Sequence, residues 1–280
     1  MFVPLQWSIE AMKLADSHCW VATSQRGFVG ERLGRGAGAS TEFLDHRPYV
    51  LGDELRRVDW RAFARTDQLL IRRYREEVRP QLELLLDNSA SMGCDAEKRE
   101  SALGLAQLIA RSAQAAGIGV RCRALNQGLI PDELLFSGEL EFDQPVNLAQ
   151  VLRETFPRIR LGAEVVVISD FLAAMDPSAI TNLVAARAQG MSFLQILGDS
   201  DLRPEQGGLV ELVDSETGLR HSIDLSSSVI ERYQQRLNRL QEEWSNALLM
   251  VGGVWSVFDS QESIHRHATQ LVELGRLRPQ

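Results

Sequence analysis

The alternation of apolar runs with helical patterns between residues 81 and 197 most constrains the fold of this chain. The runs QLELLLD (81–87) and EVVVISD (164–170) are nearly continuous in apolar residues, as is typical of strands buried on both faces of a sheet. Helical patterns that end at glycine or proline separate such runs. This alternation predicts an α/β fold, with a mainly parallel sheet and helices on both faces.

The expected elements cover most of the chain. Helices are predicted over 1–25, 96–117, 147–157 and 176–190, and strands over 68–77, 81–87, 118–125, 134–138, 164–170 and 191–197. A hairpin is expected over 208–225, turning at Thr217-Gly218. A last long helix is predicted to start at Ser228, with Glu231 completing a capping box.

These elements predict three regions. Residues 1–80 form an arginine-rich N-terminal extension, which we expect to pack on the core because little linker separates it from the first core strand. Residues 81–200 form the α/β core, and residues 201–280 add a C-terminal hairpin and helices.

Composition and apolar stretch length indicate the cellular compartment in which the protein is expected. The 280 residues carry a net charge of −8, which is mild and names no partner. Three cysteines without CxxC spacing disfavour a disulfide framework or a structural zinc site. The N-terminus has no signal pattern, and the longest apolar stretch (247–258) is shorter than the roughly 20 residues that span a bilayer. We therefore expect a cytoplasmic protein without a membrane span.

Two strands end in aspartate, at Asp87 and Asp170. If these strands are neighbours, both carboxylates meet at the carboxyl edge of the sheet, together with the hydroxyls of Ser89 and Ser91. Hard oxygen ligands of this kind suit Mg²⁺. The alternative is that these residues only form turns and helix caps, as Asp and Ser often do after a strand.

Several stretches of the sequence resemble motifs of known protein families. DNSASMG resembles the DxSxS signature of the von Willebrand factor A fold, whose metal-ion-dependent adhesion site uses it. A longer set of motifs resembles the bacterial domain-of-unknown-function family fifty-eight from about residue 26 to the C-terminus. These motifs are, in order, GRGAGASTEFLDHRPYVLGDELRRVDWRAFARTDQLLIRRYREE, DNSASM, VVVISDF and VDSETG.

The resemblance implies a von Willebrand A-like core with family-specific additions at both ends, acting beside a MoxR-type AAA+ ATPase in the assembly or maturation of other proteins. By position, Asp87, Ser89, Ser91 and Asp170 match the metal ligands of the adhesion site. The threonine of the intermediate loop has no counterpart, and Asn147 is the nearest polar residue. The expected ion is Mg²⁺, with Mn²⁺ and Ca²⁺ as alternatives, and an acidic client side chain would complete its shell.

The alternative function is a metal-dependent phosphohydrolase built on the same aspartates. Phosphoryl transfer needs a neighbouring acid and a cation that stabilises charge. Ser89 stands where a second acid is wanted, and neither of the two lysines, Lys13 and Lys98, has an evident place at a strand end. The expectation is therefore a binding module rather than an enzyme.

An arginine-rich block is the second candidate site. The segment from Arg56 to Arg79 contains eight arginines and four acidic residues. The favoured interpretation is a structural salt-bridge cluster around Trp60 and Phe63; a docking face for an acidic partner and, least favoured, a nucleic-acid surface are the alternatives. The proposed cluster contains Arg56, Arg57, Asp59, Arg61, Arg65 and Asp67.

Two further motifs are expected to carry no chemistry. The glycine-rich stretch GRGAG (34–38) lacks the Walker A lysine and a preceding strand, so a surface loop is expected instead of a nucleotide site. His265 and His267 have HxH spacing on a predicted helix, where residues two apart point in different directions. A solvated helix face is expected there.

Overall fold

The computed structural model describes residues 6–22, 43–74, 80–125, 127–143, 147–205, 207–215 and 218–280. The chain forms two compact units, one of residues 1–28 and 80–280 and the other of residues 29–79. This division differs from the predicted boundaries because the N-terminal helix α1 (Gln6–Ala15) belongs to the larger unit. Its Ala11 and Ala15 are buried in the same apolar cluster as helix α4 (Ala96–Ala115).

A six-stranded sheet lies at the centre of the larger unit, in the order β11-β8-β7-β4-β5-β6. Its neighbouring strands are parallel except for β5 and β6, which pair antiparallel. This confirms the predicted α/β class with a mainly parallel sheet. The strands are β4 (Gln81–Leu86), β5 (Gly119–Ala124), β6 (Gly128–Ile130), β7 (Glu164–Ser169), β8 (Gly190–Leu197) and β11 (Val254–Asp259).

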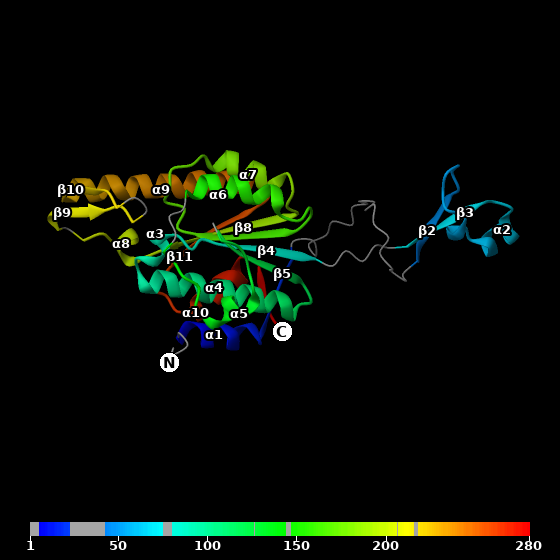
Figure 1. Ribbon diagram of the computed structural model, residues 1–280, viewed down its shortest axis with the longest axis horizontal. Helices are drawn as coiled ribbons and strands as arrows, with labels where there is room; N and C mark the ends of the chain where they lie inside the picture. The colour runs from blue at the N-terminus through cyan, green and yellow to red at the C-terminus, as the bar shows by residue number, and fades with distance from the viewer. Residues whose placement is uncertain are drawn as a thin grey trace. The chain divides into compact units, whose positions relative to one another are not determined.

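Helices cover both faces of this sheet (Figure 1). One face carries α1, α4, α5 (Asp132–Ser137) and α10 (Ile264–Glu273); the other carries α6 (Leu148–Thr155), the short η3 (Phe156–Arg158), α7 (Pro177–Ala185) and α9 (Ser227–Met250). Successive side chains of β4 point to opposite faces of the sheet. Leu84 and Leu86 therefore pack in the apolar cluster with α4, and Leu85 packs in the apolar cluster with α6 and α7.

The connections diverge at the middle of the sheet. The chain passes from β4 through α4 to β5 on one side, and from β7 through α7 to β8 on the other side and the other face. The carboxyl ends of β4 and β7 therefore flank a topological switch point, the place where open α/β sheets bind ligands.

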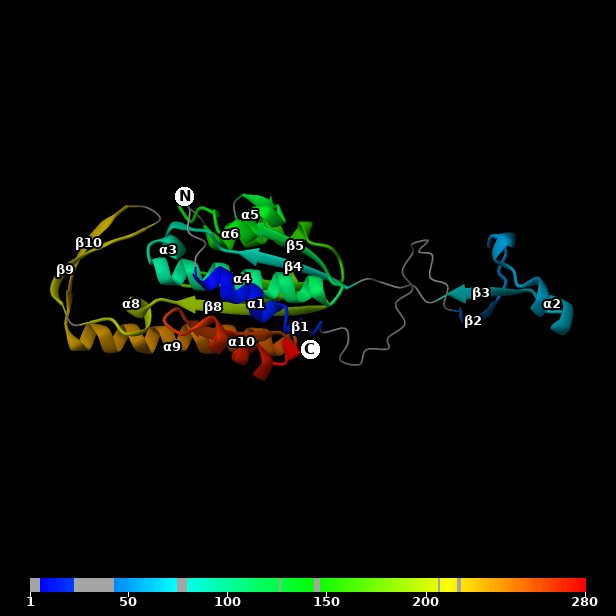
Figure 2. The same cartoon turned by 90° about the horizontal axis from the view of Figure 1, so that it is seen from below.

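Several predicted elements were wrong in detail. The segment predicted as a strand over 134–138 lies in helix α5, and the strand at the sheet edge is β6. The predicted helix over 1–25 ends at Ala15, and β1 (His18–Trp20) then pairs antiparallel with β12 (Leu277–Pro279), near the C-terminus (Figure 2). Strand formation there depends on a partner at the far end of the chain.

The C-terminal additions follow the prediction more closely. Strands β9 (Gly208–Val213) and β10 (Arg220–Leu225) pair antiparallel, which confirms the hairpin; Thr217 of its expected turn lies outside the described residues. They follow the short helix α8 (Asp199–Leu202). The capping-box prediction for α9 was wrong, because Ser226 is its N-cap and makes no side-chain capping bond.

The HxH pair on α10 divides between two environments. His265 is exposed, as expected, but His267 is fully buried, so the predicted solvated face was wrong for this residue. Its Nε2 donates to the Asp259 carbonyl at 3.1 Å. Burial lowers the pKa of His267 to about 4, and the ring is therefore neutral at pH 7.

The smaller unit is a hairpin with one short helix. Strands β2 (Phe43–Pro48) and β3 (Leu70–Tyr74) pair antiparallel, and the connection holds η2 (Leu55–Arg57) and α2 (Trp60–Thr66). Asp59 caps α2 by accepting from the backbone of Arg61 and Ala62. The glycine-rich stretch 34–38 lies outside the described residues.

The predicted salt-bridge cluster around Trp60 and Phe63 was wrong. Asp59 instead pairs with Arg72 at 2.8 Å and with His46 at 2.9 Å, because both side chains project from the hairpin strands towards the helix cap. Hydrogen bonds from Arg72 and then His46 hold the pKa of Asp59 far below its usual range. Trp60 itself is largely exposed.

The cysteines and the apolar helices bear on the expectations about disulfides and membrane spans. All three cysteines are free thiols. Within the described ranges, no helix combines the length and the apolar character required to cross a bilayer.

Candidate functional site

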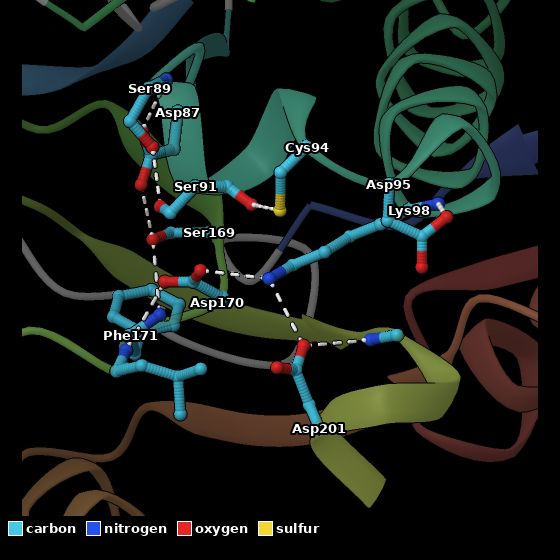
Figure 3. A network of polar contacts seen from close by, with 12 residues as sticks. Asp87, Ser89, Ser91, Cys94, Asp95, Lys98, Ser169, Asp170, Phe171 and Asp201 are labelled. Carbon is cyan, nitrogen blue, oxygen red and sulfur yellow. Dashed lines mark hydrogen bonds and ion pairs between the residues drawn. The ribbon is translucent and has the colours of Figure 1, made fainter. Parts of the chain in front are cut away.

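The strand-end acids lie at the same edge of the sheet (Figure 3). Strands β4 and β7 are adjacent and parallel, and the backbone N–H of Asp87 donates to the Ile168 carbonyl at 2.9 Å. Asp87 therefore follows β4 directly beside the point where Asp170 follows β7. The convergence expected from the two strand ends is present at the topological switch point.

Hydrogen bonds fix the first loop around the Asp87 carboxylate. Its Oδ1 accepts from the backbone N–H of Ser89 at 3.0 Å, and its Oδ2 accepts from the Ser169 hydroxyl at 2.5 Å. The hydroxyls of Ser89 and Ser91 lie 3.0 Å apart. Two carboxylates and two hydroxyls of the predicted set thus meet at one place.

A lysine lies inside this group of acids (Figure 3). The Nζ of Lys98, in the first turn of α4, donates to Asp170 Oδ2 at 2.9 Å and to Asp201 Oδ2 at 3.1 Å. Asp201 belongs to α8, directly after β8, and its carboxylate also accepts from the Gly198 backbone. We call Asp87, Asp170, Asp201 and Lys98 the acid cluster.

The lysine is almost wholly withdrawn from water, with 3% of its side chain exposed. Burial by itself lowers its pKa, but the charges of Asp170 and Asp201 outweigh this effect and raise the pKa above its ordinary value. Lys98 is therefore a permanent internal cation at neutral pH.

Asp87 has no such compensation. It is 1% exposed, and no ion pair reaches it from the described part of the chain. Burial first, and the neighbouring Asp170 charge second, raise its pKa to about 6, although hydrogen bonds from Ser169 and Ser89 act in the opposite direction. The side of the cluster at Asp87 lacks positive charge.

An aromatic side chain anchors the second loop. Phe171 adopts a left-handed backbone conformation with φ of 51°, which is unusual for a bulky residue. Its ring is fully buried and lies 5.5 Å from the Phe193 ring and 5.0 Å from the Trp244 ring, measured between centroids. This packing holds the backbone that carries Asp170.

Sequence reasoning missed three members of the site: Lys98, Asp201 and Ser169. For Lys98 a signal was available, since it precedes Ser101, Ala102 and Leu105 at the three-, four- and seven-residue spacings of one buried helix face. Asp201 had no comparable signal, because its position depends on the turn that follows β8.

Asn147, the remaining predicted ligand, has a different task. It is the N-cap of α6, and its Oδ1 accepts from the Gln150 backbone at 3.1 Å. Its side chain is exposed. Within the described residues, no group of three or more His, Cys, Asp and Glu side chains is arranged to hold a metal ion, so any ligand set here must draw on serine hydroxyls.

Fold and site together define a doubly wound α/β protein with a buried acid cluster at its switch point. The family model described as "Protein of unknown function DUF58" matches residues 45–131, from β2 through the Asp87 loop to β6. This segment is similar to that family, and the match is shorter than the expected range from residue 26 onwards.

Two curated relatives of the chain are described as uncharacterized. Uncharacterized proteins of Mycobacterium tuberculosis and Mycobacterium bovis are each 26% identical over 208 residues, which is 68% of this chain. The chain covers 65% of the length of these relatives.

Two solved structures from Bacteroides species have low similarity. The conserved hypothetical protein BatB of Bacteroides thetaiotaomicron gives a TM-score of 0.36 at 11% identity, covering 70% of this chain and 98% of its own. An aerotolerance-related membrane protein of Bacteroides fragilis, with multiple mutations to serines, gives 0.38 at 17% identity, covering 70% and 99%.

Proposed function

We propose that this protein is a non-catalytic binding module of the von Willebrand A-like type, whose switch-point site holds Mg²⁺ and grips an acidic side chain of a protein client. The observation that carries the proposal is the meeting of Asp87 and Asp170 with two serine hydroxyls at the ends of adjacent parallel strands. We further propose that it acts in the cytoplasm with a MoxR-type AAA+ ATPase during assembly or maturation of other proteins.

The donor set fits a hard divalent cation. Asp87, Ser89, Ser91 and Asp170 supply oxygen only, and Mg²⁺ prefers oxygen ligands while keeping several waters. Mn²⁺ and Ca²⁺ fit the same donors. The raised pKa of Asp87 marks a buried carboxylate in need of a positive neighbour. When bound, the ion supplies positive charge and an exchangeable position for a partner carboxylate.

Lys98 affects the net charge of the site that such an ion would enter. The single ammonium charge pairs with both Asp170 and Asp201, so the acid cluster with Asp87 ionised keeps two uncompensated negative charges. A divalent ion would bring the cluster to neutrality, and an exchangeable water on that ion would leave a coordination position for a partner carboxylate. Ser91 is the most exposed of the four proposed ligands, so we propose that the partner approaches past it.

Calorimetric titration tests the metal part of the proposal. We expect wild-type protein to bind Mg²⁺ and Mn²⁺ at millimolar concentration or below. Asp87→Ala should lose the binding, because it removes the one acid-cluster carboxylate that forms no ion pair within the described residues. Asp176→Ala is the matched control, since that aspartate caps α7 and lies outside the acid cluster. Absence of binding to wild type would rule out the assignment.

Affinity capture from the native organism tests the partnership. We expect tagged wild-type protein to retain an AAA+ ATPase and to lose client proteins when a chelator removes divalent ions. Asp87→Ala should behave as the chelated wild type does. Client retention that ignores both the chelator and the substitution would contradict a metal-bridged mechanism.

A metal-dependent phosphohydrolase is the second candidate, and one observation favours it. Lys98 places a cation beside the strand-end Asp170, a position for which the sequence offered no evident lysine. Against it, both Asp87 oxygens accept hydrogen bonds, and the surface cavity of about 380 Å³ between α7 and α9 is lined by none of the acid-cluster residues. Metal-dependent hydrolysis of an aryl phosphate that Asp87→Ala abolishes would favour the enzyme.

A further inference from the structure

Two groups can be distinguished among the arginine side chains that the structure describes in the smaller unit. Arg47 forms two hydrogen bonds to Asp53, at 2.6 and 2.7 Å, and hydrogen bonding to Arg47 lowers the pKa of Asp53 to about 2. Arg72 pairs with Asp59, and Arg57 pairs with Glu54 at 3.3 Å. These pairs occupy three of the unit's acidic side chains, at Asp53, Glu54 and Asp59.

The second group has no counter-charge. Arg56, Arg61 and Arg65 are exposed, and none forms an ion pair within the described residues. Arg61 and Arg65 are four residues apart on α2, so their guanidinium groups project from the same side of the helix. The unit therefore presents cationic groups that its own acids do not neutralise.

The same helix face carries an exposed tryptophan. Helical spacing places Trp60 and Ala64 beside the two arginines, and all four are exposed, whereas Ala62 on the opposite face is buried. Trp60 is 56% exposed. Leu51 and Leu55, just before α2 in the chain, are also exposed. We call Trp60, Arg61, Ala64 and Arg65 the α2 face.

The net charge of this unit differs in sign from that of the rest of the protein. Residues 29–79 contain eleven arginines and nine acidic residues, which gives this unit a net charge of +2. Because the whole chain has a net charge of −8, the other residues together carry −10. Arginine and tryptophan are among the side chains that contribute most to binding energy at protein interfaces. The smaller unit of this acidic protein presents arginines without an ion pair beside an exposed tryptophan. Arginine also matches carboxylates with two parallel hydrogen bonds.

From this juxtaposition we propose that the α2 face is a docking surface for an acidic segment of a partner protein. Carboxylates of the partner pair with Arg61 and Arg65, and an apolar side chain packs on Trp60. Nucleic acid fits less well, because three arginines among exposed apolar side chains do not form a basic track and the whole protein repels a polyanion. The surface shares no residue with the acid cluster and needs no metal.

Fluorescence anisotropy on the full chain tests the surface. The probe is a labelled peptide of repeated Glu-Glu-Leu, compared with a Lys-Lys-Leu peptide and a single-stranded oligonucleotide. We expect the acidic peptide alone to bind, with affinity reduced about tenfold or more by Arg61→Glu/Arg65→Glu and by Trp60→Ala. Arg61→Lys/Arg65→Lys should weaken binding less, and chelator should change nothing.

Arg232→Glu/Arg236→Glu is the matched control, since these arginines are also exposed and four residues apart on a helix, α9. An equal loss in this control would overturn the proposal, because binding would then follow net charge. Tighter binding of the oligonucleotide would overturn it in favour of nucleic acid. Self-association abolished by the Arg61/Arg65 reversal would assign the surface to a second copy of the chain.

Discussion

Replacing Lys98 by methionine is expected to lower the free energy of unfolding by about 3–5 kcal/mol, because it leaves the buried Asp170 and the partly buried Asp201 without their cation. Methionine is apolar and similar in length, so the loss reports mainly the charge. Denaturant unfolding followed by tryptophan fluorescence measures it. The effect concerns Asp170 and Asp201, which lie 2.9 and 3.1 Å from the ammonium.

The pH dependence of this loss identifies its cause. Without Lys98, the acid cluster keeps its carboxylates and loses its cation, which should raise the pKa of Asp87, already raised by burial and by the Asp170 charge, still further. A raised carboxyl pKa favours the folded state when the group is protonated, so Lys98→Met should regain stability relative to wild type as the pH falls. A loss independent of pH would indicate altered packing.

The other lysine provides the control. Lys13 is exposed on α1, and Lys13→Met should change stability by no more than about 0.5 kcal/mol. Lys98→Arg keeps the charge and should retain part of the stability. A Lys98→Met protein within about 1 kcal/mol of wild type would show that the acids are hydrated or protonated in the native state.

Phe171→Ala is expected to cost about 3–5 kcal/mol, the usual range for removing a fully buried aromatic ring. The ring contacts Phe193, Trp244 and Trp255, so its loss opens a cavity beside the loop that carries Asp170. We also expect weaker Mg²⁺ binding, although no proposed ligand is changed. Denaturant unfolding and calorimetric titration measure the two effects.

Glycine at the same position separates packing from backbone strain. A φ of 51° is strained for alanine and easy for glycine, so Phe171→Gly should be at least as stable as Phe171→Ala, against the usual order of the two residues. Leu172→Ala, at a partly exposed neighbour, should cost much less. If Phe171→Gly proves clearly less stable than Phe171→Ala, the left-handed conformation is not retained.

The amino-acid sequence by itself determined the layered core and the meeting of Asp87 with Asp170. Buried strands show as apolar runs, and parallel strands place their carboxyl ends at one edge, so local pattern and general topology sufficed. The same reasoning failed for β1, which forms only because β12 pairs with it from the far end of the chain.

Only the tertiary structure decided the charge balance. Lys98 comes from α4 and Asp201 from α8, and no sequence spacing relates them, yet they share one ion-pair network with the buried Asp170. Likewise, Asp59 could have paired with several nearby arginines, but the β2–β3 hairpin placed Arg72 and His46 against it and left Arg61 and Arg65 exposed. Electrostatic energy depends on distance and burial in three dimensions, which a one-dimensional pattern does not contain.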